Sequence, residues 1–444
     1  MRQKWNISLQ HLFKPKNALL TALAVLLVPT LTYGQTQSGA LDASFGTGGK
    51  VTTDFAGAGD GAGAIAVQPD GKLVVAGGAT IDAQADFALA RYDSSGTLDP
   101  SFGTDGRVTT DFGGRYEGAS SVALQPDGKI VVAGGSVIGF YDNFALARYN
   151  SDGTLDATFG SGGKVITNFG EVSSRAYSVA VQPDGKIVAT GYANIDGEED
   201  FALVRYNANG TLDATFGAGG KVITEFGRLQ QGFSYAFGNS IAVQSNGKIV
   251  VAGRAYIGAG FDAALARYES DGMLDASFGT GGKVITDFGG SNDLVSSVAV
   301  QPDGNIVAAG QANVVRGYGF ALARYTSSGT LDASFGAGGI VTTDFGIFDQ
   351  GFSVAYAASL AVQLDGRMVA AGRAYINGGF HSGLARYNSD GTLDASFGTG
   401  GKVTADFQGP LGSDQFTSVV VQPDGKIVAA VGGLGDFTLV RYNN

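Results

Sequence analysis

"FALARYNSDGTLDATFGSGGKVITNFG", residues 144–170, returns almost unchanged as "FALVRYNANGTLDATFGAGGKVITEFG", residues 201–227. The same landmarks recur along the chain at a nearly constant spacing, 57 or 62 residues for the LD string, which is the signature of a repeat architecture. The LDxSFG or LDxTFG string begins at Leu41, Leu98, Leu155, Leu212, Leu274, Leu331 and Leu393. The Q-x-[DN]-G string begins at Gln68, Gln125, Gln182, Gln244, Gln301, Gln363 and Gln422. Seven copies of each landmark therefore cover 41–444.

Each repeat contains four short β-like runs, here named a, b, c and d. In the second repeat they are SVALQ (121–125), KIVVAGG (129–135), FALARY (144–149) and KVITNF (164–169). The a and b runs are separated by PDG, in which proline, aspartate and glycine favour a tight turn. Because most runs are apolar on both faces and none has a helical period, we expect sheets packed on two sides.

Seven repeats of four antiparallel strands predict an all-β, seven-bladed β-propeller, a single domain over residues 35–444. The chain ends support a closed ring. A lone d run, 50–55, opens the domain and a lone c run, 437–442, ends it. Pairing these two segments would complete the last blade and remove two exposed sheet edges, so we expect 50–55 to pair with 437–442.

The first 34 residues differ from the rest. Four basic residues, Arg2, Lys4, Lys14 and Lys16, precede the uncharged run ALLTALAVLLVPTLT (18–32). This run is too short for a typical membrane-spanning helix and is followed by small residues. We interpret 1–34 as a cleaved signal peptide and expect no membrane insertion afterwards. The remaining chain would carry 25 Lys and Arg against 40 Asp and Glu, a balance that argues against a nucleic-acid partner.

The chain contains no cysteine, which excludes disulfides, thiolate metal sites and cysteine nucleophiles. The repeated string SVAVQPDGKIVVAGG…FALARYNSDGTLDASFGTGGKV resembles the delta-60 repeat of exported bacterial proteins, and the likeness covers about nine-tenths of the chain. The resemblance implies a propeller-like fold and a secreted, periplasmic or cell-surface location in bacteria. It implies no activity, so no functional residue is carried over.

Features present in every repeat are most simply explained by folding. The arginine of RY and the aspartate of LD recur seven times, and an arginine in an apolar strand needs a partner, so we expect structural Arg–Asp or Arg–backbone pairs. Asn150, Asp152 and Asp156 in the NSDGTLD loop faintly resemble a calcium loop but lack its terminal Glu. We therefore expect backbone capping and no cofactor, with calcium as the alternative.

Strand order places the a–b and c–d connections on one face, and the b–c and d–a connections on the other. The first face is nearly uniform between repeats, whereas the second, here the variable face, differs from repeat to repeat. Two similar pairs of segments are predicted as long loops there, 227–240 with 253–263 and 346–359 with 372–382. Aromatic rings beside arginine suit sugar stacking or a peptide or protein interface, although the rings could equally plug the long loops onto the propeller. The candidate ligand-binding residues are Phe233, Tyr235, Phe237, Arg254, Tyr256, Phe261, Phe352, Tyr356, Arg373, Tyr375 and Phe380.

Catalysis has little support in the sequence. His381 is expected in an exposed loop, and His11, the other histidine, lies in the presumed signal peptide, so no His-cluster zinc site is expected. SDGT superficially resembles the sialidase Asp-box without its Trp, and no G-x-S-x-G elbow is present. Paired carboxylates remain an option for glycan cleavage. The candidates for such a pair are Asp262, Asp349, Glu198, Glu199 and Asp200.

These observations favour a monomeric, non-catalytic binding or scaffold module for a glycan or protein outside the cytoplasm. A carboxylate-dependent glycan hydrolase or lyase and a purely structural surface protein are the alternatives.

Overall fold

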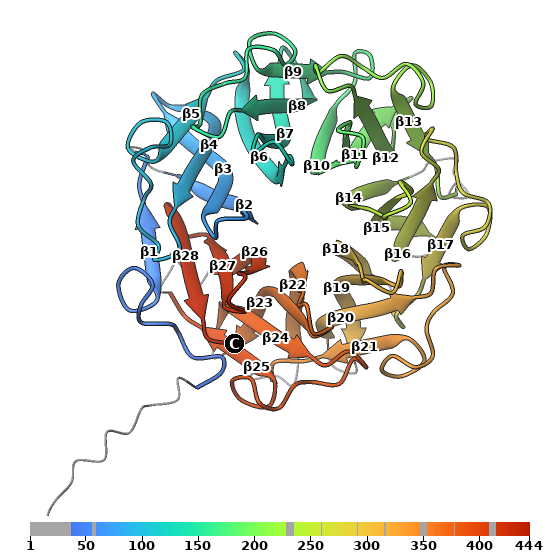
Figure 1. Ribbon diagram of the computed structural model, residues 1–444. Coiled ribbons are helices and arrows are strands. Elements are labelled where there is room, and N and C mark those ends of the chain that lie inside the picture. Colours follow the sequence, from blue (N-terminus) through green and yellow to red (C-terminus); the bar gives the residue numbers. More distant parts are fainter. Residues whose placement is uncertain are drawn as a thin grey trace, which may run out of the picture. The chain divides into compact units, whose positions relative to one another are not determined.

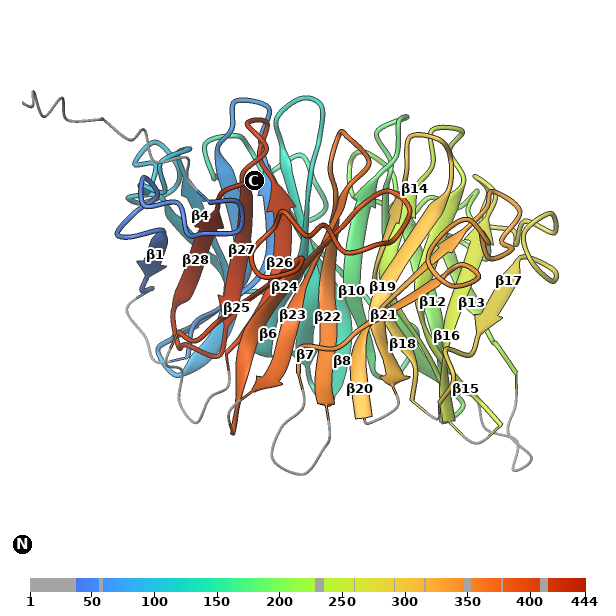
Figure 2. The ribbon, with the colours of Figure 1, turned by 90° about the horizontal axis from the view of Figure 1, so that it is seen from below.

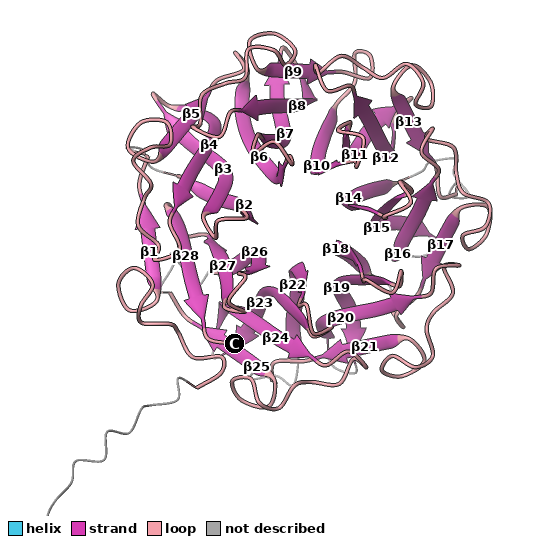
Figure 3. Ribbon diagram, in the orientation of Figure 1, coloured by secondary structure: helices cyan, strands magenta, loops and turns pink. Residues whose placement is uncertain are grey.

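The computed structural model describes residues 37–55, 59–227, 235–258, 260–290, 292–314, 317–346, 353–376, 378–407 and 414–444. Internal contacts divide the chain into Met1–Gln35 and Thr36–Asn444, and all described residues belong to the second unit. Every described element is a β-strand (Figure 3). The described ranges contain no helix of the length and apolar character needed to cross a membrane.

The repeat is visible directly in the strand bounds. The a strands are β2 (Gly61–Val67), β6 (Arg115–Leu124), β10 (Ser174–Val181), β14 (Ala236–Val243), β18 (Leu294–Val300), β22 (Ser353–Val362) and β26 (Gln415–Val421). The b strands are β3 (Leu73–Ile81), β7 (Ile130–Ile138), β11 (Ile187–Ile195), β15 (Ile249–Ile257), β19 (Ile306–Val314), β23 (Met368–Ile376) and β27 (Ile427–Gly432). The c strands are β4 (Gln84–Tyr92), β8 (Tyr141–Tyr149), β12 (Glu198–Tyr206), β16 (Gly260–Tyr268), β20 (Gly317–Tyr325), β24 (Gly379–Tyr387) and β28 (Phe437–Tyr442). The d strands are β1 (Lys50–Thr53), β5 (Arg107–Thr110), β9 (Lys164–Thr167), β13 (Lys221–Thr224), β17 (Lys283–Thr286), β21 (Ile340–Thr343) and β25 (Lys402–Ala405).

The fold is an all-β propeller of four-stranded antiparallel sheets. The a strands lie innermost and the d strands outermost, around a common centre (Figure 1). Two groups, β18–β21 and β22–β25, are joined into one larger sheet by a short parallel pairing of Gly317 with Ser353 and Tyr318 with Val354.

The two ends of the described domain share one sheet, with strand order β1-β28-β27-β26. Lys50–Thr53 pairs antiparallel with Phe437–Val440. This pairing is shorter than the expected pairing of 50–55 with 437–442, because the chain leaves the ladder after Thr53. Further contacts join β26 to β2: the Thr417 hydroxyl donates to the Ala62 carbonyl over 2.8 Å.

Each central strand contributes to two cores, because both of its faces are buried. Phe144 and Leu146 on β8 pack with residues of the following repeat such as Ile187. Ala145 and Ala147, on the opposite face, pack with residues of the preceding repeat. Burial of both faces explains why the c runs read as continuously apolar rather than alternating.

The RY arginine joins one repeat to the next. The Arg205 Nε–H donates to Asp213 Oδ2 over 2.8 Å, and Arg205 Nη1 donates to the Ser270 carbonyl of the next c–d loop. The guanidinium also lies 4.5 Å from the centre of the Phe216 ring. The seven Arg–Asp pairs of this kind are Arg91–Asp99, Arg148–Asp156, Arg205–Asp213, Arg267–Asp275, Arg324–Asp332, Arg386–Asp394 and Arg441–Asp42. The predicted structural role of this arginine is therefore confirmed.

The aspartates of the NxDGTxD loops are used within the chain. Asp152 Oδ1 accepts the backbone N–H and the hydroxyl of Thr154 at 2.9 and 2.6 Å. Asp156 accepts hydrogen bonds from Arg148 and Thr158. These contacts agree with the capping role that we expected for the loop.

The buried tyrosine of RY hydrogen-bonds the last residue of the preceding d strand. The Tyr206 hydroxyl donates to Thr167 Oγ1 over 2.8 Å, and five other repeats have the same bond. Tyr442 is the exception. Ala405 stands where the other d strands have threonine, and the buried Tyr442 hydroxyl has no partner within the described residues.

We predict that Ala405→Thr stabilises the protein, because it supplies the missing acceptor to a buried hydroxyl. The gain expected for one such hydrogen bond is about 1 kcal/mol in the free energy of unfolding. Chemical denaturation would measure it. Thr224→Ala, which removes the matching bond to Tyr268, should lose a similar amount. An unchanged or lower stability of Ala405→Thr would contradict the prediction.

We predict that Asp213→Asn destabilises the fold by about 3 kcal/mol, since it leaves the buried Arg205 without its charged partner. Asp184→Asn is the matched control, because Asp184 is exposed and pairs only with Lys186 at 3.8 Å.

Acid should weaken the same pairs. Burial alone would raise the pKa of Asp213, but hydrogen bonds from Thr215 and Lys186 and the charge of Arg205 hold it well below its usual range. The stabilisation is complete above about pH 5 and is lost progressively as the pH falls through the unfolded-state pKa towards the lower folded-state pKa. Asp213→Asn should therefore show a smaller decrease in free energy of unfolding between pH 6 and pH 3 than the wild type. Equal acid sensitivity would refute this assignment.

Candidate functional site

The variable face lies at the edge of the sheets opposite the uniform a–b turns and c–d loops (Figure 2). The prediction that 253–263 and 372–382 form b–c loops is wrong. Most of 253–263 belongs to β15 and β16, and most of 372–382 belongs to β23 and β24, with only 258–259 and 377–378 between the strands. Alternating aromatic and small residues extend these strands up to the glycines. Arg254, Tyr256, Phe261, Arg373, Tyr375 and Phe380 are therefore strand residues, held more rigidly than loop residues.

The d–a segments are also partly strand. Phe237 lies on β14 and Tyr356 on β22. Tyr235 precedes β14, where it forms a parallel bridge with Glu199 and is 37% exposed. Phe233, Phe352 and Asp349 lie outside the described residues.

The first cluster forms around Arg254, here the Arg254 cluster. Arg254 lies opposite Phe237 in the β14–β15 ladder. Its guanidinium carbon is 4.8 Å from the centre of the Phe237 ring and 4.7 Å from that of Phe261. Tyr256 meets Phe261 edge-on, with ring centres 5.2 Å apart. The structure thus brings together four of the predicted residues, and the arginine covers ring faces that we had expected to stack on a ligand.

Glycine shapes this site at one position. A Cβ on Gly253 would lie 1.8 Å from the Phe237 carbonyl oxygen. The missing side chain therefore lets β14 and β15 approach each other beside the bulge between Gly238 and Ser240. This close approach sets Arg254 directly across from Phe237.

The Arg254 cluster extends into the preceding repeat. The Tyr192 ring lies 5.5 Å from Phe237, and Tyr177 lies 5.7 Å from Tyr192. Sequence reasoning missed both tyrosines because they belong to a repeat without a long d–a segment. Tyr192 occupies the register of strand b that Arg254 holds in the next repeat, and this was the available signal for it. No comparable signal marked Tyr177.

The second cluster has the same design around Arg373, here the Arg373 cluster. Arg373 lies opposite Tyr356, and its guanidinium carbon is 4.2 Å from the ring centres of both Tyr356 and Phe380. Tyr375 meets Phe380 edge-on at 5.1 Å. The Tyr356 hydroxyl donates to Gln415 Oε1 over 3.2 Å. Tyr356, Tyr375 and Phe380, the predicted aromatic residues of this repeat that the structure describes, thus lie around Arg373.

Neither cluster arginine has a hydrogen-bond or ion-pair partner within the ranges that the structure describes, and both Nε atoms are buried. Burial lowers the pKa of Arg254, and the charges of Tyr177 and Glu199 oppose that shift. Burial raises the pKa of Glu199, against the opposing charge of Arg254. Arg175 provides a contrast, since its Nη1 donates to Asp142 Oδ2 over 2.9 Å. The two clusters therefore hold cations that the described part of the chain does not neutralise by direct contact.

Sequence reasoning also missed two exposed aromatic residues, Phe140 between β7 and β8 and Tyr116 on β6. Phe140 is 94% exposed and Tyr116, at the start of β6, is 75% exposed. Tyr116 has φ +51° where β6 bulges away from β7. The string GFYDNF at 139–144 was the available signal, but length differences between repeats directed attention elsewhere.

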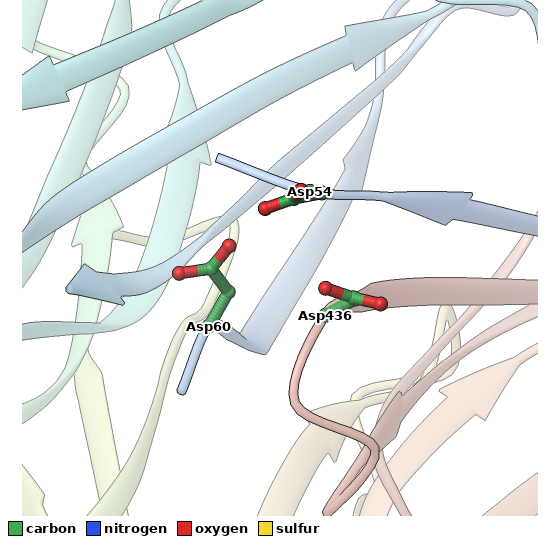
Figure 4. A group of neighbouring side chains, drawn as sticks. All are labelled: Asp54, Asp60 and Asp436. Atoms are coloured by element: carbon green, nitrogen blue, oxygen red, sulfur yellow. The ribbon is translucent and has the colours of Figure 1, made fainter. Parts of the chain in front are cut away.

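Acidic side chains gather where c begins, d ends and the next a begins. Among the described residues four such groups could hold a metal ion, and in each group one carboxylate oxygen per residue lies within 4.8 Å of the others. They are Asp54–Asp60–Asp436, Asp86–Asp111–Glu117, Glu198–Asp200–Glu225 and Asp262–Asp287–Asp293. In the first group the three carboxylates point toward one another: Asp54 directly follows β1, Asp60 directly precedes β2 and Asp436 directly precedes β28 (Figure 4).

Three of these groups contain a carboxyl with a raised pKa. Burial, followed by the charges of Asp54 and Asp60, raises the pKa of Asp436. Burial, followed by the charges of Asp287 and Asp293, raises the pKa of Asp262 to about 6. Asp86 is raised to about 6 as well, by burial and by its acidic neighbours. Because the same arrangement recurs, it is a poor signature of a single catalytic centre.

His381 is not in a loop, contrary to expectation, but on β24. Its Nε2 lies 2.9 Å from the Ile376 carbonyl oxygen, and its Nδ1 lies 3.8 Å from Asp406 Oδ2. Strands β23 and β24 extend further than the apolar pattern indicated, and His381 therefore pairs with Ala374 inside the sheet.

Six segments of the chain match the family model described as "Domain of unknown function (DUF5122) beta-propeller": 68–102, 125–159, 182–216, 244–278, 301–335 and 363–397. Together they span slightly less than half of the chain, and they identify a β-propeller repeat protein. No curated protein matches the chain in sequence.

Solved structures that resemble the chain share little sequence with it. The WD40 β-propeller domain of Doa1 is 11% identical with a TM-score of 0.49, covering 93% of this chain and 98% of that one. Virginiamycin B lyase from Staphylococcus aureus is 10% identical with a TM-score of 0.47, covering 89% and 99%. Polysaccharide lyase Uly1 is 12% identical with a TM-score of 0.45, covering 93% and 94%.

We predict that Asp262→Asn raises the melting temperature at pH 7.5 and has little effect at pH 4.5. A carboxyl whose folded-state pKa is raised loses stability as the pH rises through that value, and an amide does not titrate. Asn143 already occupies the equivalent position of another repeat. Asp344→Asn is the control, since Asp344 directly follows β21, in the place of Asp287, in a repeat that has Gly319 in the place of Asp262. Equal shifts at both pH values would contradict the prediction.

Proposed function

We propose that residues 1–34 direct export and that the remaining chain is a closed, seven-bladed propeller of the delta-60 kind. In this proposal it acts as a monomeric, non-catalytic binding module. The pairing of Lys50–Thr53 with Phe437–Val440 supports closure of the ring. The absence of cysteine and the acidic composition are compatible with a location outside the bacterial cytoplasm.

The observation that carries the binding role is the recurrence of one cluster at two places on the variable face. Arg254 and Arg373 each stand between two rings at the same register of strand b. The other repeats lack this arrangement, so closing the propeller does not require it. A feature that is elaborate, rigid and dispensable for the fold is a reasonable site for a glycan or protein partner outside the cell.

Cleavage of a glycan is the second candidate. The raised pKa of Asp262 beside Asp287 and Asp293 would suit a general acid. Release of shorter products from a polysaccharide, abolished by Asp262→Asn, would favour this function over binding alone.

We predict that the double variant Tyr256→Ala, Tyr375→Ala loses most binding to native cell-envelope material, because each tyrosine supports the ring that holds the cluster arginine. A pull-down with the domain of residues 35–444 would measure this. Asn313→Ala is the matched control, since Asn313 occupies the same position of strand b in a repeat without arginine. Binding that is unchanged in the double variant would favour a purely structural surface protein.

A further inference from the structure

The two cluster arginines differ from the other buried arginines of the domain. Each RY arginine has a carboxylate partner, and Arg175 has Asp142. Arg254 and Arg373 contact aromatic rings and have no hydrogen bond or ion pair in the described part of the chain, although the charge of Glu199 acts on Arg254 from a distance. A half-buried cation without a carboxylate in direct contact is unfavourable unless a ligand completes it. We propose that Arg254 and Arg373 are receptors for the carboxylate or sulfate groups of an acidic glycan, an inference that rests on the proposed binding function.

The fold does not require arginine at these positions. The same register of strand b holds a residue other than arginine in each remaining repeat, and three of these residues are glycine. The residues at this register are Gly78, Gly135, Tyr192, Gln311 and Gly432. Since the propeller tolerates glycine and glutamine there, the arginine serves something other than packing.

The stacking preorganises each guanidinium. Rings cover the faces of the Arg373 guanidinium from Tyr356 on β22 and Phe380 on β24, both at 4.2 Å. Stacking of this kind leaves the edge of the planar group, which carries the N–H donors, to meet an anion. Partial burial strengthens such a contact, and no side-chain freedom is lost when the anion arrives.

The chemistry of the site favours a glycan over a protein. Protein interfaces are dominated by aromatic side chains buried against the partner, whereas here the cluster rings stack on their own arginine and on each other. The group left for a ligand is therefore the charged edge of each guanidinium, which carries N–H donors. Two such edges suit a polymer that repeats its acidic group and can contact both, which raises the overall affinity.

General attraction to polyanions cannot supply this binding. The residues after 34 carry 25 basic against 40 acidic side chains, and several acidic groups lie on the same face. Binding of a polyanion would therefore have to come from particular cations rather than from net charge.

The test is isothermal titration calorimetry of the 35–444 domain with two matched pairs of polymers. Polygalacturonate is compared with its methyl ester, and dextran sulfate with dextran. We expect at least one acidic polymer to bind about tenfold or more tightly than its neutral counterpart. Arg254→Gln and Arg373→Gln should each weaken that binding about tenfold, as expected for one charge-assisted contact. Glutamine is chosen because Gln311 already occupies this register.

Arg115→Gln is the charge-matched control, because Arg115 is exposed at the start of β6 on the same face. It should leave the affinity unchanged, and thermal melting should show that all variants remain folded. Poly-glutamate tests whether charge alone suffices.

The inference is overturned if neither acidic polymer binds, if each neutral polymer binds equally well, or if poly-glutamate matches the glycans. It is also overturned if Arg115→Gln has the effect of Arg254→Gln. If Tyr256→Ala, Tyr375→Ala still abolishes binding to the envelope in any of these cases, the proposed function stands and only the ligand class is wrong.

Discussion

The ion pair between the RY arginine and the LD aspartate is the interaction on which the domain depends. It is buried and accepts further hydrogen bonds from a serine or threonine, and its arginine reaches a loop of the following repeat. One side chain thus stabilises its own c–d loop and fixes the position of the next repeat. Without disulfides, this junction and the apolar cores on either side of each sheet hold the repeats together. The requirement explains why residues of the uniform face vary so little.

The repeat made much of the fold predictable. Strand types, their order, the turn residues and the Arg–Asp pairs follow from landmarks such as Arg205 and Asp213, because every copy obeys the same physical constraints. Strand lengths were less predictable. The b and c strands run further towards the variable face than expected, so His381 and Phe261 lie in sheets. The error has a plain cause: glycine and aromatic residues near hairpin tips were taken for loop composition.

The candidate site was predictable as a set of residues but not as an arrangement. Sequence pairs such as GRAYIGAGF and GRAYINGGF marked Arg254 and Arg373, and both lie at the centres of their clusters. That the rings would cover the arginine faces, and that Tyr177 and Tyr192 would extend one cluster, depends on contacts between repeats. Phe140 was missed for a related reason. Whether a ring is exposed depends on how much of it the neighbouring repeat covers, and the sequence does not show this.

The pairing of β1 with β28 in one sheet has a consequence for the order in which the chain can fold. β1 cannot pair with its partner until β28 has been synthesised. These contacts are separated by almost the whole domain, and contacts of such long sequence separation slow folding. The sheet of β1, β28, β27 and β26 therefore stays incomplete until β28 has been synthesised, whatever the order in which the other sheets form.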